Sequence, residues 1–444
     1  MYRASKQQNP HITISRNKRS LIKILAASGF TPLLMRMLPP AHAETKADPL
    51  ELVHGIIKHP WFIEVPSGHS LVAFSRPTAA AQDNTQTIQR AVHWTKQWLR
   101  LVVKYQQNPL RASRCIAHAQ VAMHDAWLLA ATQGASAETR ELSAHRAASL
   151  VLQHLFPNET PGFFEAQYAW LAAQLPASNI NQDLAEATGT RVGQAIINRS
   201  LRDGAGRTWP VRDRPKDFPG IWQAAHPIYA VNPTEPYAGE WRSWLKPSPQ
   251  RYQPPTAPRP GSEQHRREAL EVLNVIRNLT PKQLEVAERW NLDAGSVTPA
   301  GVWMQHAIDL LLRSQIPGDR FEASVAVLAA TSVAMEDSFI ACWRIKFRDW
   351  SERPITAIRR DLAPGFTTPL VTPGFPGYVS GHSTLSGATS IVLAYFWPTE
   401  APELNAMADE AAISRLWGGI HFRSDNDEGL RVGRGIGAEV LAAL

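Results

Sequence analysis

The sequence has few cysteines, no long apolar run and no acidic residue near its start. Its 444 residues include only two cysteines, Cys115 and Cys342, which are too few for a disulfide framework or a zinc site. We expect two buried free thiols, and a single bridge between them in an oxidising compartment is the alternative. No uninterrupted apolar run reaches the roughly 18 residues that a spanning helix needs, so no transmembrane anchor is predicted.

Residues 1–43 predict an export signal. They hold basic residues and no Asp or Glu, and a moderately apolar run from Ile24 to Met35 leads to an A-x-A cleavage site at Ala41-His42-Ala43. Lys18-Arg19-Ser20-Leu21 resembles a twin-arginine signal with lysine in place of the first arginine, so the general secretory route stays open. We therefore expect a periplasmic or secreted protein that begins near Glu44.

Without this signal the chain is close to neutral. The whole sequence has 46 Lys and Arg against 39 Asp and Glu, and residues 1–43 contribute seven of the basic residues, which leaves 39 against 39. The charge balance therefore gives no reason to expect a nucleic-acid partner.

Hydrophobic periodicity predicts an all-α protein of stacked helical bundles with long loops rich in Pro and Trp. We interpret residues 44–94 as an N-terminal arm, 95–203 as an N-terminal bundle and 263–444 as a C-terminal bundle. Residues 204–262 form a connecting segment whose tryptophans predict packing against the helices. In the C-terminal half the helical pattern is clearest at 263–277, 281–291, 300–314, 321–347, 384–395, 401–418 and 429–444.

Three blocks of polar residues in the C-terminal bundle carry the chemistry. The first begins at Lys346 and ends, after six further residues, at Arg353-Pro354. The second is Ser380-Gly381-His382. The third is Ser414-Arg415, followed after five residues by His421 and after three more by Asp425. Single pieces of this kind are common on protein surfaces, and only their combination predicts a site.

The combination suits a tetrahedral oxyanion. Lys346, Arg353 and Arg415 supply three positive charges, and the two arginines add forked donors that fit paired oxygens. The Ser380 hydroxyl adds a donor, and the Gly381 amide can approach closely because glycine has no Cβ.

Two histidines complete the predicted site. His421 can attack or coordinate the central atom of the anion, and His382 can move a proton at the apical position. Asp425 lies four residues after His421. In a helix the two would share one face, so the carboxylate could fix the imidazole tautomer.

In this order and spacing the blocks resemble the signature of the phosphatidic-acid-phosphatase and haloperoxidase superfamily, with Val379 where that family usually has proline. Other segments resemble its vanadium-dependent haloperoxidase branch, so the similarity covers about residues 95–444. These segments are Leu110–Arg114, Val121–Ala126, Pro247–Pro258, Leu279–Pro281, Val297–Pro299 and Asp337–Trp343. Trp343 and Phe375 match aromatic positions of the substrate pocket beside the vanadate in chloride-oxidising relatives, and simple core packing is the alternative.

The resemblance implies two reactions for one site. In a haloperoxidase, vanadate is the cofactor, held by the three cations, Ser380 and Gly381 with His421 as the vanadium ligand, and hydrogen peroxide oxidises a halide. In a phosphatase, which needs no cofactor, the same cations clamp a phosphoester, His421 becomes a phosphohistidine and His382 protonates the leaving oxygen. Phosphate and vanadate would compete. We favour the haloperoxidase because the resemblance spans most of the chain, and an intact site disfavours a mere binding protein.

Two similar motifs lack the required partners. Pro66-Ser67-Gly68-His69 has the letters of the second block, but no K-x(6)-R-P precedes it. Ser113-Arg114 is followed by His118 only four residues after the arginine. We interpret the first motif as a coincidence in a loop, and His118 and His124-Asp125 as groups that pack or cap the bundle.

Overall fold

The described part of the chain is helical. The computed structural model describes residues 61–62, 84–210, 215–216, 218–225, 227–230, 232–246, 251–313 and 320–444. Within these ranges it contains 14 α-helices and no β-strand, and the only strand-like pairing there is an isolated bridge between Ile221 and Ser351. The predicted all-α fold class is confirmed. The predicted signal and the Pro66–His69 motif lie outside the described residues.

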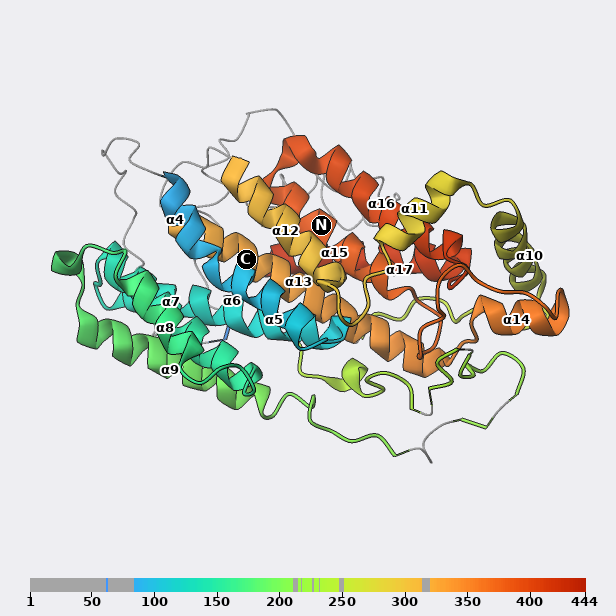
Figure 1. Ribbon diagram of the computed structural model, residues 1–444, viewed down its shortest axis with the longest axis horizontal. Helices are drawn as coiled ribbons and strands as arrows, with labels where there is room; N and C mark the ends of the chain where they lie inside the picture. Colours follow the sequence, from blue (N-terminus) through green and yellow to red (C-terminus); the bar gives the residue numbers. More distant parts are fainter. Residues whose placement is uncertain are drawn as a thin grey trace, which may run out of the picture.

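The N-terminal bundle is built around α6. Asn108 starts this helix because its side-chain oxygen accepts hydrogen bonds from the amides of Leu110 and Arg111, and Pro109 occupies the first turn, where no amide donor is needed. Helices α6, α7 and α9 pack against one another on one side of the molecule (Figure 1). The helices of this half are α4 (Asn84–Ala91), α5 (His93–Lys104), α6 (Pro109–Thr132), α7 (Ala137–Leu155), α8 (Phe163–Ala172) and α9 (Gln182–Ser200).

The C-terminal bundle centres on α15, which packs against α13, α16 and α17. Glycines let α15 and α17 approach closely, because a Cβ added at Gly433 would lie 2.0 Å from the carbonyl oxygen of Thr384. The helices are α10 (Glu263–Arg277), α11 (Pro281–Arg289), α12 (Thr298–Arg313), α13 (Arg320–Asp349), α14 (Pro354–Asp361), α15 (Gly381–Phe396), α16 (Ala401–Trp417) and α17 (Arg423–Ala443).

Helix α13 joins the two bundles. It contacts α6 on one side and α15 and α17 on the other, and it crosses the middle of the view in Figure 1. Among the described residues it is the one helix that is long and apolar enough to cross a membrane, and the whole of its apolar window is buried inside the protein. Burial on all sides explains this apolar composition. Its C-terminal turns carry Trp343 and Lys346.

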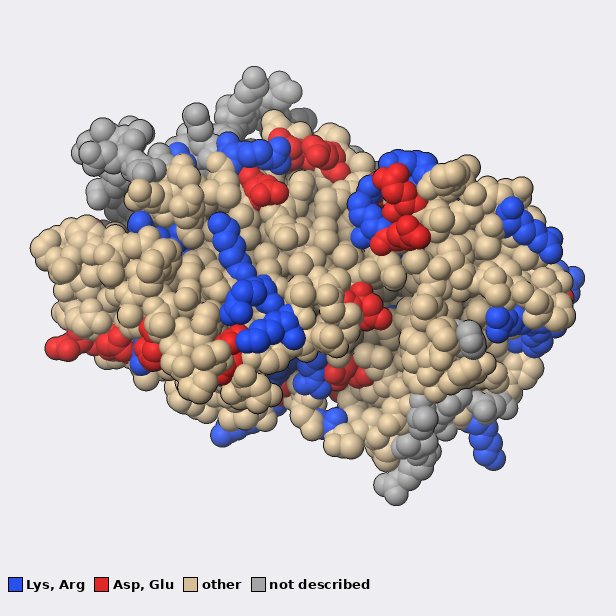
Figure 2. Space-filling view, in the orientation of Figure 1, with Lys and Arg blue, Asp and Glu red and all other residues tan. Residues whose placement is uncertain are grey.

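The described parts of the connecting segment pack against the helices through three tryptophans, as predicted. Trp222, Trp241 and Trp244 are buried, and a short 3-10 helix, η3 (Ala238–Glu240), packs on α13. One hydrophobic core runs through residues of both bundles. Because both bundles share this core, it does not test the domain limits drawn from the sequence, and they remain predictions. On the face shown in Figure 2, acidic and basic side chains are interspersed with large neutral areas.

Three helices depart most from the predicted pattern. Helix α4 lies within the residues assigned to the arm, and α14 was not predicted because eight residues between two loops give little periodic signal. Helix α17 begins at Arg423 rather than 429. Its first turns are rich in acidic residues, which look like a loop in sequence but are favourable at a helix N-terminus.

Candidate anion-binding site

The three predicted blocks meet where five helices end or begin. Lys346 lies near the C-terminus of α13, Arg353 directly precedes α14, and Arg415 lies in the last turn of α16. Ser380 caps α15, whose first residues are Gly381 and His382. His421 and Asp425 flank the start of α17. All of them are buried except His382, which is half-buried.

Lys346 is held by backbone oxygens. Its Nζ donates to the carbonyl oxygens of Pro376 and Gly377 at 2.8 and 2.7 Å. Burial is the main cause of its lowered pKa, because removing the ammonium from water disfavours the charged form. An anion beside Lys346 would favour its charged form.

The two arginines follow the same pattern. Arg353 donates through Nε to the Phe375 carbonyl at 2.9 Å and through Nη1 to the Ile420 carbonyl at 2.7 Å. Arg415 donates through Nη2 to the Ala287 carbonyl at 2.8 Å and through Nε to the Ser414 hydroxyl at 2.9 Å. Burial lowers the pKa of Arg353 to about 10 and that of Arg415 to about 9.

None of the three cations forms an ion pair with a carboxylate among the described residues. Their hydrogen bonds to carbonyl oxygens fix their positions but leave their charges uncompensated. The nearest acid in the site is Asp425, whose pKa is raised by burial and lowered again by Lys346 and Arg353. Three cations against one carboxylate leave a net buried positive charge, which is the environment that an anion needs.

The His421 ring has a defined tautomer. Its Nε2 lies 3.0 Å from Nη1 of Arg353, which can only donate, so Nε2 accepts and the proton is on Nδ1. That proton points to Asp425 Oδ2 at 2.8 Å. Burial and the nearby cations Arg353 and Lys346 hold the pKa of His421 well below its ordinary value. His421 is therefore neutral, with its lone pair on the side of the cations.

The predicted contact between His421 and Asp425 is present, but its geometric basis is different. His421 lies before α17, so the two residues do not share a helix face. Asp425 instead stands in the first turn of α17, where Oδ2 also accepts the Phe422 amide at 3.1 Å. The backbone carbonyl of Asp425 accepts the Ser380 amide at 2.8 Å, which ties α17 to the start of α15. The loop-to-helix turn therefore brings the two side chains together.

The N-terminus of α15 faces the same region. The first amides of a helix have no partner within it, and the helix dipole makes this end positive. Ser380 Oγ accepts the Ser383 amide at 3.4 Å, which leaves its own proton for another acceptor. A Cβ at Gly381 would lie 3.3 Å from the Phe339 ring and 3.4 Å from the Trp343 ring, so glycine also permits this packing.

Aromatic rings form one wall of the site. The Trp343 and Phe375 rings lie 5.0 Å apart, and Lys346 Nζ is 5.2 Å from the centre of the Phe375 ring. Arg353 lies over the same ring at 4.9 Å. Trp343 Nε1 donates to the Thr234 carbonyl at 3.0 Å, so the connecting segment helps to orient it. Both predicted aromatic residues therefore contact the cation cluster.

Two buried nitrogens of the site have no hydrogen-bond partner among the described residues. They are Nη2 of Arg353 and Nε2 of His382. Burial and the charge of Arg415 hold the pKa of His382 well below its ordinary value, so the ring is neutral. Unpaired buried polar atoms are costly, and two donor or acceptor atoms of this kind beside a cation cluster fit an oxyanion ligand. The residues present therefore suit vanadate or phosphate.

The end of α11, which packs against His382, was not predicted from the sequence as part of the site. The Trp290 ring packs edge-on against His382 with centroids 6.5 Å apart, and its Nε1 donates to Glu410 at 2.9 Å. Arg289 donates to the same oxygen at 2.6 Å. Because Arg415 bonds to Ala287, the end of α11 closes the site on two sides. Nothing in the local sequence of α11 signals this role.

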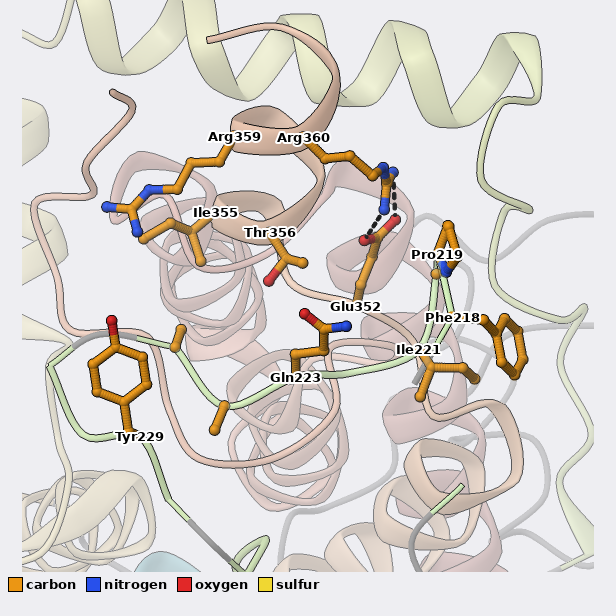
Figure 3. Close-up of a pocket in the computed structure, with 13 residues that line it drawn as sticks. Phe218, Pro219, Ile221, Gln223, Tyr229, Glu352, Ile355, Thr356, Arg359 and Arg360 are labelled. Carbon is orange, nitrogen blue, oxygen red and sulfur yellow. Dashed lines mark hydrogen bonds and ion pairs between the residues drawn. The ribbon is translucent and has the colours of Figure 1, made fainter. Parts of the chain in front are cut away.

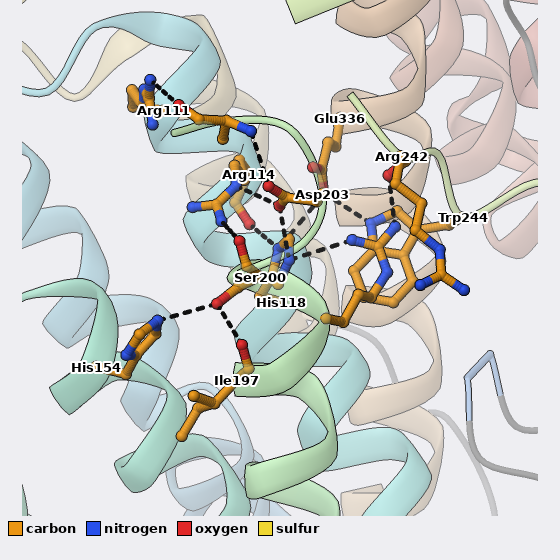
Figure 4. A network of polar contacts seen from close by, with 12 residues as sticks. Arg111, Arg114, His118, His154, Ile197, Ser200, Asp203, Arg242, Trp244 and Glu336 are labelled. Carbon is orange, nitrogen blue, oxygen red and sulfur yellow. Dashed lines mark hydrogen bonds and ion pairs between the residues drawn. The ribbon is translucent and has the colours of Figure 1, made fainter. Parts of the chain in front are cut away.

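The sequence also gave no sign of a buried network between α6, α9 and α13 (Figure 4). Arg114 pairs with Asp203 at 2.6 Å, and His118 accepts from Arg199 at 3.2 Å. Glu336 on α13 accepts the Trp244 indole proton at 2.6 Å.

The other polar residues singled out in the N-terminal bundle also pack or cap. Asp125 accepts the amides of Trp61 and Phe62. His118 and Asp125 therefore pack and cap the bundle, as the sequence predicted. The two cysteines are free and buried.

The fold and the site together define an all-α protein with a buried cluster of cations that suits an oxyanion. Solved structures similar to it include the first bacterial vanadium-dependent iodoperoxidase, with 25% sequence identity, a TM-score of 0.66 and coverage of 83% of this chain and 98% of that one. An apo-type bacterial vanadium-dependent chloroperoxidase is 16% identical, with a TM-score of 0.56 and coverage of 74% and 93%. The holo-type is 18% identical, with a TM-score of 0.55 and coverage of 83% and 94%. These two chloroperoxidases show the shared fold alone.

A family profile adds a match in sequence. The VCPO second helical-bundle domain matches residues 397–444, which include Arg415, His421 and Asp425. No curated protein sequence matches the chain. The profile match and the structural similarity support a vanadium-haloperoxidase-like member of the phosphatidic-acid-phosphatase and haloperoxidase superfamily.

Proposed function

We propose that this protein is a vanadate-dependent haloperoxidase that oxidises a halide with hydrogen peroxide. The charge of the site carries the proposal. Three buried cations that bond only to neutral groups lie around a neutral His421. Arg353 Nη2 and His382 Nε2 have no hydrogen-bond partner among the described residues. The similarity to a vanadium-dependent iodoperoxidase over 83% of the chain supports the choice of reaction.

In this proposal the chain's own residues bind and orient the cofactor. Lys346, Arg353 and Arg415 neutralise its charge, and the Ser380 hydroxyl and Gly381 amide donate to its oxygens. His421 would turn its Nε2 lone pair, which accepts from Arg353 Nη1 in this structure, to vanadium, while Asp425 holds the proton on Nδ1. Bound vanadate supplies a Lewis acid that activates hydrogen peroxide towards a halide.

His382 moves the proton. Its ring is neutral when no anion is bound, so Nε2 can accept a proton from hydrogen peroxide and later return it to the departing oxygen. Trp343 and Phe375 would form the apolar wall of the halide pocket, where they exclude water from the reacting atoms.

A second candidate is a phosphatase that works through a phosphohistidine. The hydrogen bond from His421 Nδ1 to Asp425 favours it, because a nucleophilic histidine also needs an unprotonated Nε2. The segment His421–Asp425 also resembles the acid-phosphatase version of the motif.

One assay pair separates the candidates. Purified protein is tested for bromide and iodide oxidation by hydrogen peroxide, with and without vanadate, beside p-nitrophenyl phosphate hydrolysis. We expect vanadate-dependent halide oxidation that millimolar phosphate inhibits and that His421→Ala abolishes. Arg267→Gln, an exposed change on α10, is the control. Phosphatase activity without vanadate, and no halide oxidation with it, would overturn the proposal.

We also propose that the chain is exported to the periplasm or secreted. The support is the acid-free basic start and the Ala41-His42-Ala43 site in the sequence. Mass spectrometry of the protein from cell fractions should find a terminus near Glu44 outside the cytoplasm. An intact Met1 on cytoplasmic protein would contradict this.

A further inference from the structure

A cavity of about 470 Å³ lies on the surface beside α14 (Figure 3). Ile355, Thr356 and Arg359 of α14 form one wall, and described residues of the connecting segment, among them Phe218 and Tyr229, form the other. None of the residues assigned to the anion-binding site lines it. The cavity is therefore a separate feature, with room for a small organic molecule.

One cation in this cavity is available to a ligand. Arg359 donates through Nε to the Phe366 carbonyl at 2.7 Å, and its two terminal nitrogens have no hydrogen-bond partner among the described residues. Arg360 differs, because both of its terminal nitrogens bond to Glu352, at 2.6 and 3.0 Å. The lining has two positive charges and one negative, and the ion pair leaves Arg359 as the uncompensated charge.

The rest of the lining combines apolar side chains with the polar residues Gln223 and Thr356. Phe218 and Tyr229 are 56% and 60% exposed, which is high for large aromatic side chains. In Figure 3 the Tyr229 ring and the Arg359 guanidinium lie towards one end of the cavity and the Phe218 ring towards the other. Ala224 and Ala225 line the same wall as Tyr229. A flat apolar ligand would cover these surfaces and remove them from water.

We propose that this cavity binds an aromatic carboxylate. The carboxylate pairs with the forked donors of Arg359, and the ring packs between Ile355 and Tyr229. An inorganic anion fits less well, because it would leave most of the volume and the apolar lining unfilled. The inference goes beyond the proposed function and does not depend on it.

Calorimetry on the full chain tests the proposal with 2-naphthoate and its neutral analogue 2-naphthamide. Peroxide, halide and vanadate are left out, and millimolar phosphate is added to compete for the anion-binding site. We expect naphthoate to bind more tightly than naphthamide, and Arg359→Gln to reduce this preference roughly tenfold or more, because a bond to a charged group is lost. Arg267→Gln removes an equal charge from the exposed surface of α10 and should change nothing.

A second variant locates the site without touching a charge. Ala225→Trp fills the cavity and should abolish binding of both probes, while circular dichroism reports whether the fold is kept. The proposal is overturned if neither probe binds saturably to the wild type. It is also overturned if Arg359→Gln keeps the full preference, or if Arg267→Gln loses it equally.

Discussion

Replacing Asp425 with asparagine should separate two effects of this carboxylate. Oδ2 accepts both His421 Nδ1 and the Phe422 amide, and an asparagine oxygen can occupy the same position. The opposite orientation would place an NH₂ group against two donors, so it is excluded. Asp425→Asn therefore keeps the hydrogen-bond geometry and removes the negative charge behind the imidazole.

The loss of charge acts in opposite directions on two anions. An anion in the site is repelled by Asp425, and two unit charges a few ångströms apart interact by roughly 2–4 kcal/mol at an effective dielectric constant near 20. Phosphate should therefore bind equally well or better in the variant. Vanadate also needs a basic His421 nitrogen, and loss of such an orienting partner costs roughly 10–100-fold in metal affinity. The preference for vanadate over phosphate should fall by at least about tenfold.

Titration calorimetry with each anion measures this preference directly. Asp427→Asn is the matched control, because Asp427 is exposed and two residues further along α17. Burial already raises the pKa of Asp425, so an uncharged side chain should be tolerated there without loss of fold. If both anions weaken or strengthen to the same extent in Asp425→Asn, the carboxylate does not act through His421 and the argument is refuted.

Three other predictions follow from named contacts. His421→Ala should abolish vanadate binding, whereas His382→Ala should keep it and slow turnover roughly 10²–10⁴-fold, and equal losses of affinity would contradict this division. Burial raises the pKa of Glu336 from 4.5 to about 8. Between these pH values the carboxyl is protonated in the folded state and ionised in the unfolded state. The free energy of unfolding therefore falls as pH rises, by about 1.4 kcal/mol per pH unit at most. Glu336→Gln should flatten that slope in the free energy of unfolding, and an unchanged slope would show that another group is responsible. Glu410→Ala removes the acceptor of the Trp290 indole proton and should lower turnover roughly tenfold at unchanged vanadate affinity. Glu410→Gln keeps an acceptor oxygen and should restore activity. If it does not, Glu410 does not position Trp290.

The chemistry of the site could be predicted from sequence because side chains carry it. Lys346, Arg353 and Arg415 are recognisable by type and spacing, and the structure brings them together. Most of their partners are backbone carbonyls, those of Ala287, Phe375 to Gly377 and Ile420. Every residue has a backbone carbonyl, so the residue types in a sequence do not reveal which carbonyls face a cation. For the same reason Trp290 was missed, since its place over His382 depends on how α11 ends rather than on a motif.

The helices show the same division. Long helices with regular apolar spacing, such as α10 and α15, were predicted nearly to their ends. Helix α14 was missed, because eight residues carry little periodicity. The start of α17 was misplaced because Asp425 and its acidic neighbours look like a loop, although they stabilise a helix N-terminus. The contact between His421 and Asp425 was predicted from helical spacing. In the structure His421 precedes α17, and the turn into this helix brings the two side chains together.

The partners of the buried arginines distinguish a structural cluster from a binding one. In the N-terminal bundle Arg114 lies 2.6 Å from Asp203, so its charge is balanced within the protein. Arg353 and Arg415 are equally buried, yet they bond to carbonyls, a hydroxyl and a neutral histidine. A carboxylate partner would hold such an arginine and cancel its charge, whereas a carbonyl holds it and leaves the charge available. An uncompensated buried cation lowers the stability of the folded state, and a bound anion offsets this loss of stability. Carbonyl partners therefore suit the proposed role of this site, which is to bind a multiply charged oxyanion.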